Sequence, residues 1–137
     1  MNITTDYLVS LAACQEGIDA FLSIFPDGEV ELSSDNISKA LSGDLNVAWL
    51  IERINDQQTL AEMSKHDSVR ASVAINQNTP ADALAELSQD KSYLVRSRVA
   101  SNQNTPTEAL AELSKDEHYL VRDAVTKNPT YKGAQTA

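Results

Sequence analysis

The sequence has little cysteine and no long apolar run, and each shortage excludes a class of protein. Cys14 is the only cysteine among 137 residues, so an intrachain disulfide and a cysteine-based metal or iron–sulfur site are excluded. A lone thiol predicts a reducing, cytoplasmic location. No stretch approaches the roughly 20 apolar residues that a membrane span needs, and we expect no membrane association.

Aromatic and basic residues are also scarce. Aromatic residues make up 5% of the chain, which suits a helical protein better than a β-sandwich. The formal net charge is −9, and residues 1–55 hold nine acidic but only two basic side chains. This charge disfavours direct binding to nucleic acid or to an anionic membrane. It is compatible with a basic protein partner, or simply with solubility.

The main positive feature is a repeat with a period of 26 residues. Residues 81–106 and 107–129 share their apolar and polar positions, as in the pairs Leu84 and Leu110 or Asn102 and Asn128. An earlier copy, residues 59–80, has the same parts with two residues missing before Val69. A period of this length is typical of a stacked array, in which each unit buries its apolar face against its neighbours.

Each copy predicts two short helices. Thr-Pro pairs at residues 79–80 and 105–106 predict helix starts, with the threonine hydroxyl accepting a hydrogen bond from a free N–H and proline at the first helical position. Leucines such as Leu84 form the face of the first helix, and valines four residues apart, such as Val95 and Val99, form that of the second.

An asparagine follows each second helix, at Asn76, Asn102 and Asn128. Asparagine tolerates the left-handed conformation, so we expect these residues to close the helices and turn the chain. The alternative is that the three side chains form a hydrogen-bonding strip.

Residues 1–55 differ from the repeats. They predict short helices and one extended stretch, where Val30 and Leu32 alternate with Glu29 and Glu31. We expect this acidic segment to cap the open face of the first repeat, with Trp49 as a core anchor; stacking of Trp49 on a ligand is the alternative. Residues 56–131 hold the repeats, and residues 132–137 predict a frayed tail.

The pattern Leu-Ala-x-Leu-x-x-Asp, followed by Val-Arg-x-x-Val-Ala-x-Asn-x-x-Thr-Pro, fills residues 84–106 and resembles the leucine-rich repeat variant family. Residues 110–129 match until Thr126 replaces the alanine. The resemblance implies an all-α fold, a short right-handed α-solenoid of about three two-helix repeats, similar in style to HEAT and armadillo arrays, here with an N-terminal helical cap. The N-terminal segment loosely resembles the start of small phage and bacterial proteins.

Arg70, Arg96 and Arg122 occupy one position in successive copies and are candidates for partner binding. A column of guanidinium groups can face a carboxylate-rich or phosphate-rich partner. The structural alternative has more support, because Asp90 and Asp116 precede Arg96 and Arg122 by six residues and can pair with arginines of the array.

Two further groups are candidates for partner binding. Tyr93 and Tyr119 recur at the start of the second helix and serve either as packing between repeats or as aromatic anchors for a partner. Asp27, Glu29 and Glu31 form an acidic group in the N-terminal segment, for which a solvated surface is the plain interpretation.

Catalytic, metal and cofactor signatures are not found. His66 and His118 lack the spacing of a metal pair, and the sequence has neither a nucleophile elbow nor a glycine-rich phosphate loop. We therefore predict a non-enzymatic scaffold without a cofactor that binds another protein, and whose open C-terminal end can form a homodimer. The alternative is an acidic inhibitor, phage-encoded, that mimics nucleic acid and blocks a host nucleic-acid-handling or defence complex.

Overall fold

The chain is mainly helical, which confirms the coarse fold prediction. The computed structural model describes residues 1–43 and 45–131, so the predicted frayed tail lies outside the described residues. The chain divides into two compact units, Met1–Arg53 (unit 1) and Ile54–Ala137 (unit 2). Within the described residues, no helix is both long enough and apolar enough to cross a membrane.

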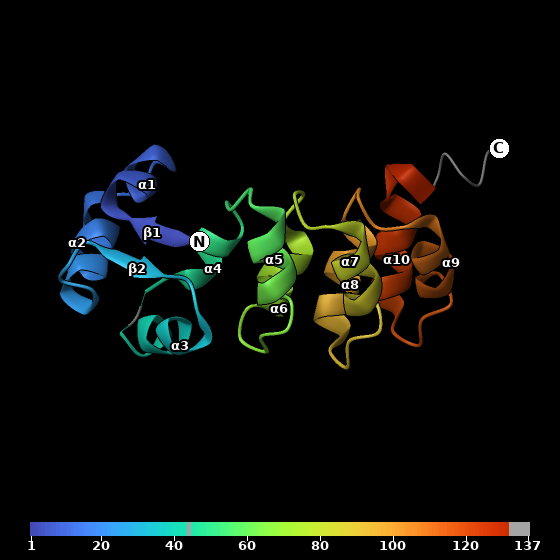
Figure 1. Ribbon diagram of the computed structural model, residues 1–137. Coiled ribbons are helices and arrows are strands. Elements are labelled where there is room, and N and C mark those ends of the chain that lie inside the picture. Colours follow the sequence, from blue (N-terminus) through green and yellow to red (C-terminus); the bar gives the residue numbers. More distant parts are fainter. Residues whose placement is uncertain (44, 132–137) are drawn as a thin grey trace. The chain divides into compact units, whose positions relative to one another are not determined.

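Unit 1 combines four short helices with a small sheet (Figure 1). The helices are α1 (Thr5–Ser10), α2 (Gln15–Ile24), α3 (Ser34–Ser42) and α4 (Val47–Ile51). Strands β1 (Asn2–Thr4) and β2 (Glu29–Glu31) pair antiparallel, with Ile3 opposite Val30. The extended stretch predicted from the alternating residues 29–32 is confirmed, whereas its partner strand β1 was not predicted.

Local chemistry explains where these elements begin. Gly28 enters β2 with a φ of +76°, a conformation that glycine adopts without steric cost. The side chains of Thr4, Ser33 and Asn46 accept hydrogen bonds from backbone N–H groups three residues later and so start α1, α3 and α4.

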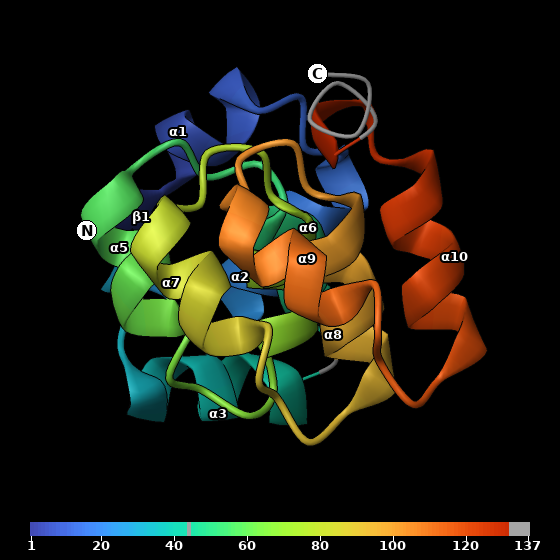
Figure 2. The same ribbon diagram turned by 90° about the vertical axis from the view of Figure 1, so that its right-hand side faces the viewer.

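Between residues 54 and 128, unit 2 contains three pairs of helices that follow one another along the unit (Figures 1 and 2). The pairs are α5 (Gln57–Met63) with α6 (Arg70–Ile75), α7 (Ala81–Leu87) with α8 (Tyr93–Ser101), and α9 (Thr107–Leu113) with α10 (Tyr119–Lys127). The second helices pack in succession, α6 against α8 and α8 against α10. Helices of six to nine residues are not stable alone, so this packing must supply their order.

The core of unit 2 repeats with the sequence. The predicted leucine face is confirmed, because Leu84 and Leu110 are completely buried. The predicted valine face is confirmed in the same way by Val99 and Val125. The equivalent residues of the first copy, Leu60 and Val73, are equally buried, so all three copies contribute to one apolar layer.

Shortening a side chain in this apolar layer should lower the stability of the fold. We expect Leu110→Ala to lower the free energy of unfolding by about 2–5 kcal/mol, because it removes buried methyl groups and leaves a cavity. Leu120→Ala is the matched control, since Leu120 is 41% exposed. Urea unfolding followed by circular dichroism measures both; a loss below about 1 kcal/mol at Leu110 would contradict its place in the core.

Candidate functional site

The three asparagines that end the second helices are buried, not exposed. Asn76, Asn102 and Asn128 are at most 2% exposed. Their backbones are extended, with φ between −70° and −80°. The prediction of a left-handed closing residue is therefore wrong, and the buried amide groups need hydrogen-bond partners.

Those partners lie in the preceding copy. The Asn102 Nδ2 donates to the carbonyl oxygens of Ala74 (2.8 Å) and Asn76 (2.9 Å). The Asn128 Nδ2 donates in the same way to Ala100 (2.7 Å) and Asn102 (3.0 Å). Each Oδ1 accepts the backbone N–H two residues later, as Asn102 does from Asn104 at 2.9 Å. The asparagine column is thus a hydrogen-bonding strip, but one that joins repeats.

The Thr-Pro pairs also act differently from the prediction. Helices α7 and α9 begin one residue after Pro80 and Pro106, with the prolines as their caps. The buried hydroxyl of Thr105 donates to the carbonyl oxygen of Val99 at 2.6 Å, and Thr79 repeats this bond one period earlier. The threonine hydroxyl is therefore a donor and not a capping acceptor. Its hydrogen bond holds the loop against the end of the preceding helix.

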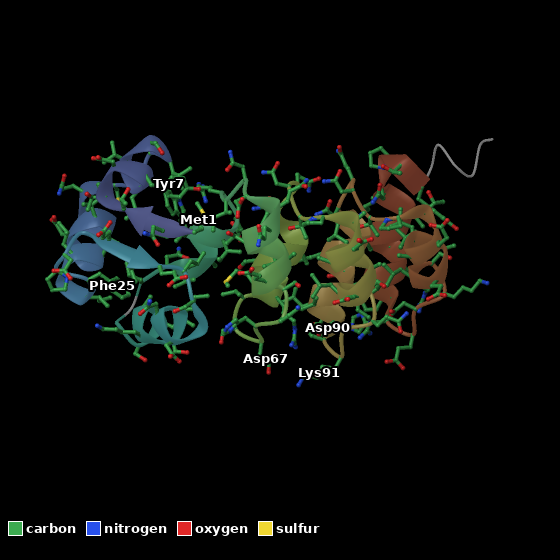
Figure 3. The ribbon with its side chains drawn as sticks, viewed as in Figure 1. Met1, Tyr7, Phe25, Asp67, Asp90 and Lys91 are labelled. Atoms are coloured by element: carbon green, nitrogen blue, oxygen red, sulfur yellow. The ribbon has the colours of Figure 1, made fainter. Side chains whose placement is uncertain are left out.

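The first two candidate arginines are engaged within unit 2. Arg96 directs Nε and Nη2 to the two carboxylate oxygens of Asp116, at 2.7 and 3.1 Å, and its Nη1 to the carbonyl of Asp90 at 2.8 Å. Arg70 Nε lies 2.7 Å from a carboxylate oxygen of Asp90. Arg70 and Arg96 therefore each pair with an aspartate of the next copy. Asp90 lies in the turn between α7 and α8 (Figure 3).

The third arginine is placed differently. Arg122 is exposed, and its Nη1 donates to the carbonyl oxygen of Asp116 at 2.6 Å. In the part of the chain that the structure describes, no carboxylate lies within ion-pair distance of Arg122. Of the three candidate arginines, it alone presents its guanidinium group to solvent.

The two candidate tyrosines lie at the starts of α8 and α10. The ring of Tyr93 stacks on the ring of His118, with centroids 3.9 Å apart and nearly parallel planes. The following leucines, Leu94 and Leu120, are exposed by 46% and 41%, and Tyr119 by 65%. These four exposed side chains occupy corresponding positions on α8 and α10, two helices that pack together, and are called the Tyr–Leu patch (Tyr93, Leu94, Tyr119 and Leu120).

Sequence reasoning missed the two leucines of this patch. The signal was present, since each leucine follows a repeated tyrosine and precedes the buried valine of the second helix. The first copy lacks the corresponding Tyr-Leu pair, and its second helix begins only at Arg70.

The acidic candidates belong to unit 1. Asp27, Glu29 and Glu31 are exposed, and the two glutamates project from the same face of β2 because side chains alternate along a strand. Trp49 is half-buried, and the Arg53 guanidinium lies 4.4 Å from the centroid of its ring.

Unit 1 also holds an apolar cavity of about 310 Å³. No sequence signal indicated it, because its walls come from separate elements. The apolar side chains in these walls include those of Ile3, Phe21, Phe25, Ile37, Val47 and Trp49.

The described residues do not assemble a metal centre. Among residues 1–43 and 45–131, no three His, Cys, Asp or Glu side chains lie close enough to hold a metal ion. His118 has a local role instead, as its Nδ1 accepts a hydrogen bond from the backbone N–H of Leu120 at the start of α10.

Comparison of the chain with models of protein families, with curated proteins and with solved structures gave no match.

The asparagine strip predicts a large effect of one substitution. Asn102→Ala removes two buried hydrogen bonds and a partly buried one, and it leaves two carbonyl groups without this donor. We therefore expect the unfolding free energy to fall by at least about 2 kcal/mol. The exposed neighbour provides the control, Gln103→Ala. Equal stability of the two variants in urea unfolding would show that the strip does not hold the repeats together.

The Arg96–Asp116 pair predicts a pH dependence. Burial alone would raise the pKa of Asp116, but hydrogen bonds from Arg96 and from the His118 backbone outweigh it and lower the pKa. The ionised carboxylate therefore stabilises the fold above its ordinary pKa of about 4, and this contribution is lost as the pH falls through the lowered value.

Urea unfolding of wild type and Asp116→Asn at a series of pH values measures this contribution. The stability advantage of wild type should be constant near pH 7 and should shrink below about pH 4. Glu86→Gln is the control, because Glu86 is exposed and no basic side chain of the described residues lies within ion-pair distance of it. An advantage that persists unchanged into strong acid would contradict the role of this ion pair.

Proposed function

We propose that the chain is a non-enzymatic protein-binding module. In this proposal unit 2 is a short right-handed α-solenoid of about three repeats, as its resemblance to the leucine-rich repeat variant family implies, and unit 1 caps it. The protein acts in the reducing cytoplasm, where Cys14 stays a free thiol.

The Tyr–Leu patch is the observation that carries the proposal. Two tyrosines and two leucines are exposed on adjacent helices whose valines are buried in the core. Tyrosine supplies a large amphipathic contact area, and central aromatic and arginine side chains dominate binding energy in many interfaces. Arg122 lies one helical turn from Tyr119 on α10 and adds a charge to the surface.

Capture of partners by the immobilised chain tests this function. The double variant Leu94→Ser with Leu120→Ser should lose a partner that wild type enriches from lysate of the source cell, because it removes apolar contact area. Leu41→Ser is the matched control, since Leu41 in α3 is also 41% exposed. Circular dichroism checks the fold of both. Equal capture by all three proteins, or no capture by wild type, would overturn the proposal.

The second candidate function is an acidic inhibitor that mimics nucleic acid. Exposure of Asp27, Glu29 and Glu31 in unit 1 favours it, because carboxylates can stand in for phosphates in a basic groove. This function requires that binding to a nucleic-acid-handling complex weaken steeply with salt and be displaced by DNA. Binding insensitive to both would eliminate it.

A further inference from the structure

Two side chains of α8 hold the turn that precedes α10. Tyr93 and Arg96 lie three residues apart, on one face of the helix. Arg96 donates hydrogen bonds to both carboxylate oxygens of Asp116, and the ring of Tyr93 stacks on that of His118. We call Tyr93 and Arg96 the clamp of α8. Asp116 and His118 are two residues apart, so this clamp contacts one acidic and one planar side chain of a single turn.

The same pair of side chains recurs one period later on α10, as Tyr119 and Arg122. The Nη1 of Arg122 donates to the carbonyl of Asp116, just as the Nη1 of Arg96 donates to the carbonyl of Asp90. This anchor orients both guanidinium groups in the same way. In residues 1–43 and 45–131, however, no carboxylate pairs with Arg122. The ring of Tyr119 stacks on that of His118, with centroids 5.3 Å apart, but Tyr119 is still 65% exposed where Tyr93 is 44% exposed.

We infer that the Tyr119–Arg122 clamp binds a protein segment that presents a carboxylate followed, two residues later, by a planar ring. The inference rests on the proposed protein-binding function and names the chemistry of the partner. A guanidinium fork matches the two oxygens of a carboxylate, and the tyrosine ring adds a flat surface for stacking. A protein segment fits better than nucleic acid, because the clamp on α8 holds such a segment and the chain carries a net charge of −9.

A cyclic peptide provides the probe. It carries the sequence of residues 114–120, Ser-Lys-Asp-Glu-His-Tyr-Leu, closed through its backbone to preserve the turn. Titration into the isotope-labelled full chain should shift the NMR signals of Tyr119 and of the Arg122 Nε–H. Replacing the peptide's aspartate by asparagine should weaken binding at least about tenfold, since a charge-assisted pair is lost.

Variants of the protein locate the effect. Arg122→Gln should weaken binding of the peptide by a similar factor. Arg98→Gln, which removes an equal charge from the neighbouring helix α8, should leave binding of the peptide unchanged. The inference is overturned if the aspartate and asparagine peptides bind equally, if Arg122→Gln binds as wild type does, or if single-stranded DNA occupies the clamp more tightly than the peptide.

Two results separate this inference from its alternatives. Self-association in light scattering that Arg122→Gln abolishes would assign the clamp to a second copy of the chain and overturn the partner segment. Capture that depends on Leu94 and Leu120 without any peptide binding would keep the proposed function and remove the inference. Peptide binding without any captured partner would keep the inferred clamp chemistry and remove the proposed function.

Discussion

A buried side-chain amide sets the geometry of unit 2. Asn76 donates to the carbonyl oxygen of Ile54, Asn102 to that of Asn76, and Asn128 to that of Asn102, so the bonds form a continuous series from the first copy to the last. Each amide fixes the distance and the direction between consecutive turns. Helices of only six to nine residues could not maintain such a register by themselves.

Near the opposite ends of these helices, Arg70 and Arg96 each pair with the aspartate of the next copy, Asp90 and Asp116. The amides at one end and the ion pairs at the other leave little freedom between neighbouring helix pairs, and the leucine and valine layer fills the space between. The surface that remains free is therefore presented on a fixed scaffold. The exposed side chains of the Tyr–Leu patch are part of that surface.

Periodicity in the sequence was enough to predict the helical fold, the buried leucine and valine faces, and the structural alternative for Arg70 and Arg96. It was not enough to predict hydrogen-bond direction. The hydroxyl of Thr105 can donate or accept with equal ease, and only the position of the Val99 carbonyl decides between the two. The role of Asn102 likewise depends on carbonyl groups 26 and 28 residues earlier.

Features built from distant residues also escaped prediction. Strand β1 has three residues, too few to show an alternating pattern, and it forms because β2 lies beside it. The cavity of unit 1 depends on how several short elements meet. In contrast, the sequence does contain a signal for the exposure of Leu94 and Leu120, because each lies one residue before a valine of the buried face.

Hydrogen exchange of side-chain amides tests most directly whether the asparagine series holds unit 2 together. The Nδ2 protons of Asn102 and Asn128 should exchange only when the helix pairs separate, and therefore far more slowly than the exposed side-chain amide of Gln103. If the Asn102 amide exchanges as fast as that of Gln103, the bonds between repeats are not maintained in solution, and the account of the scaffold is contradicted.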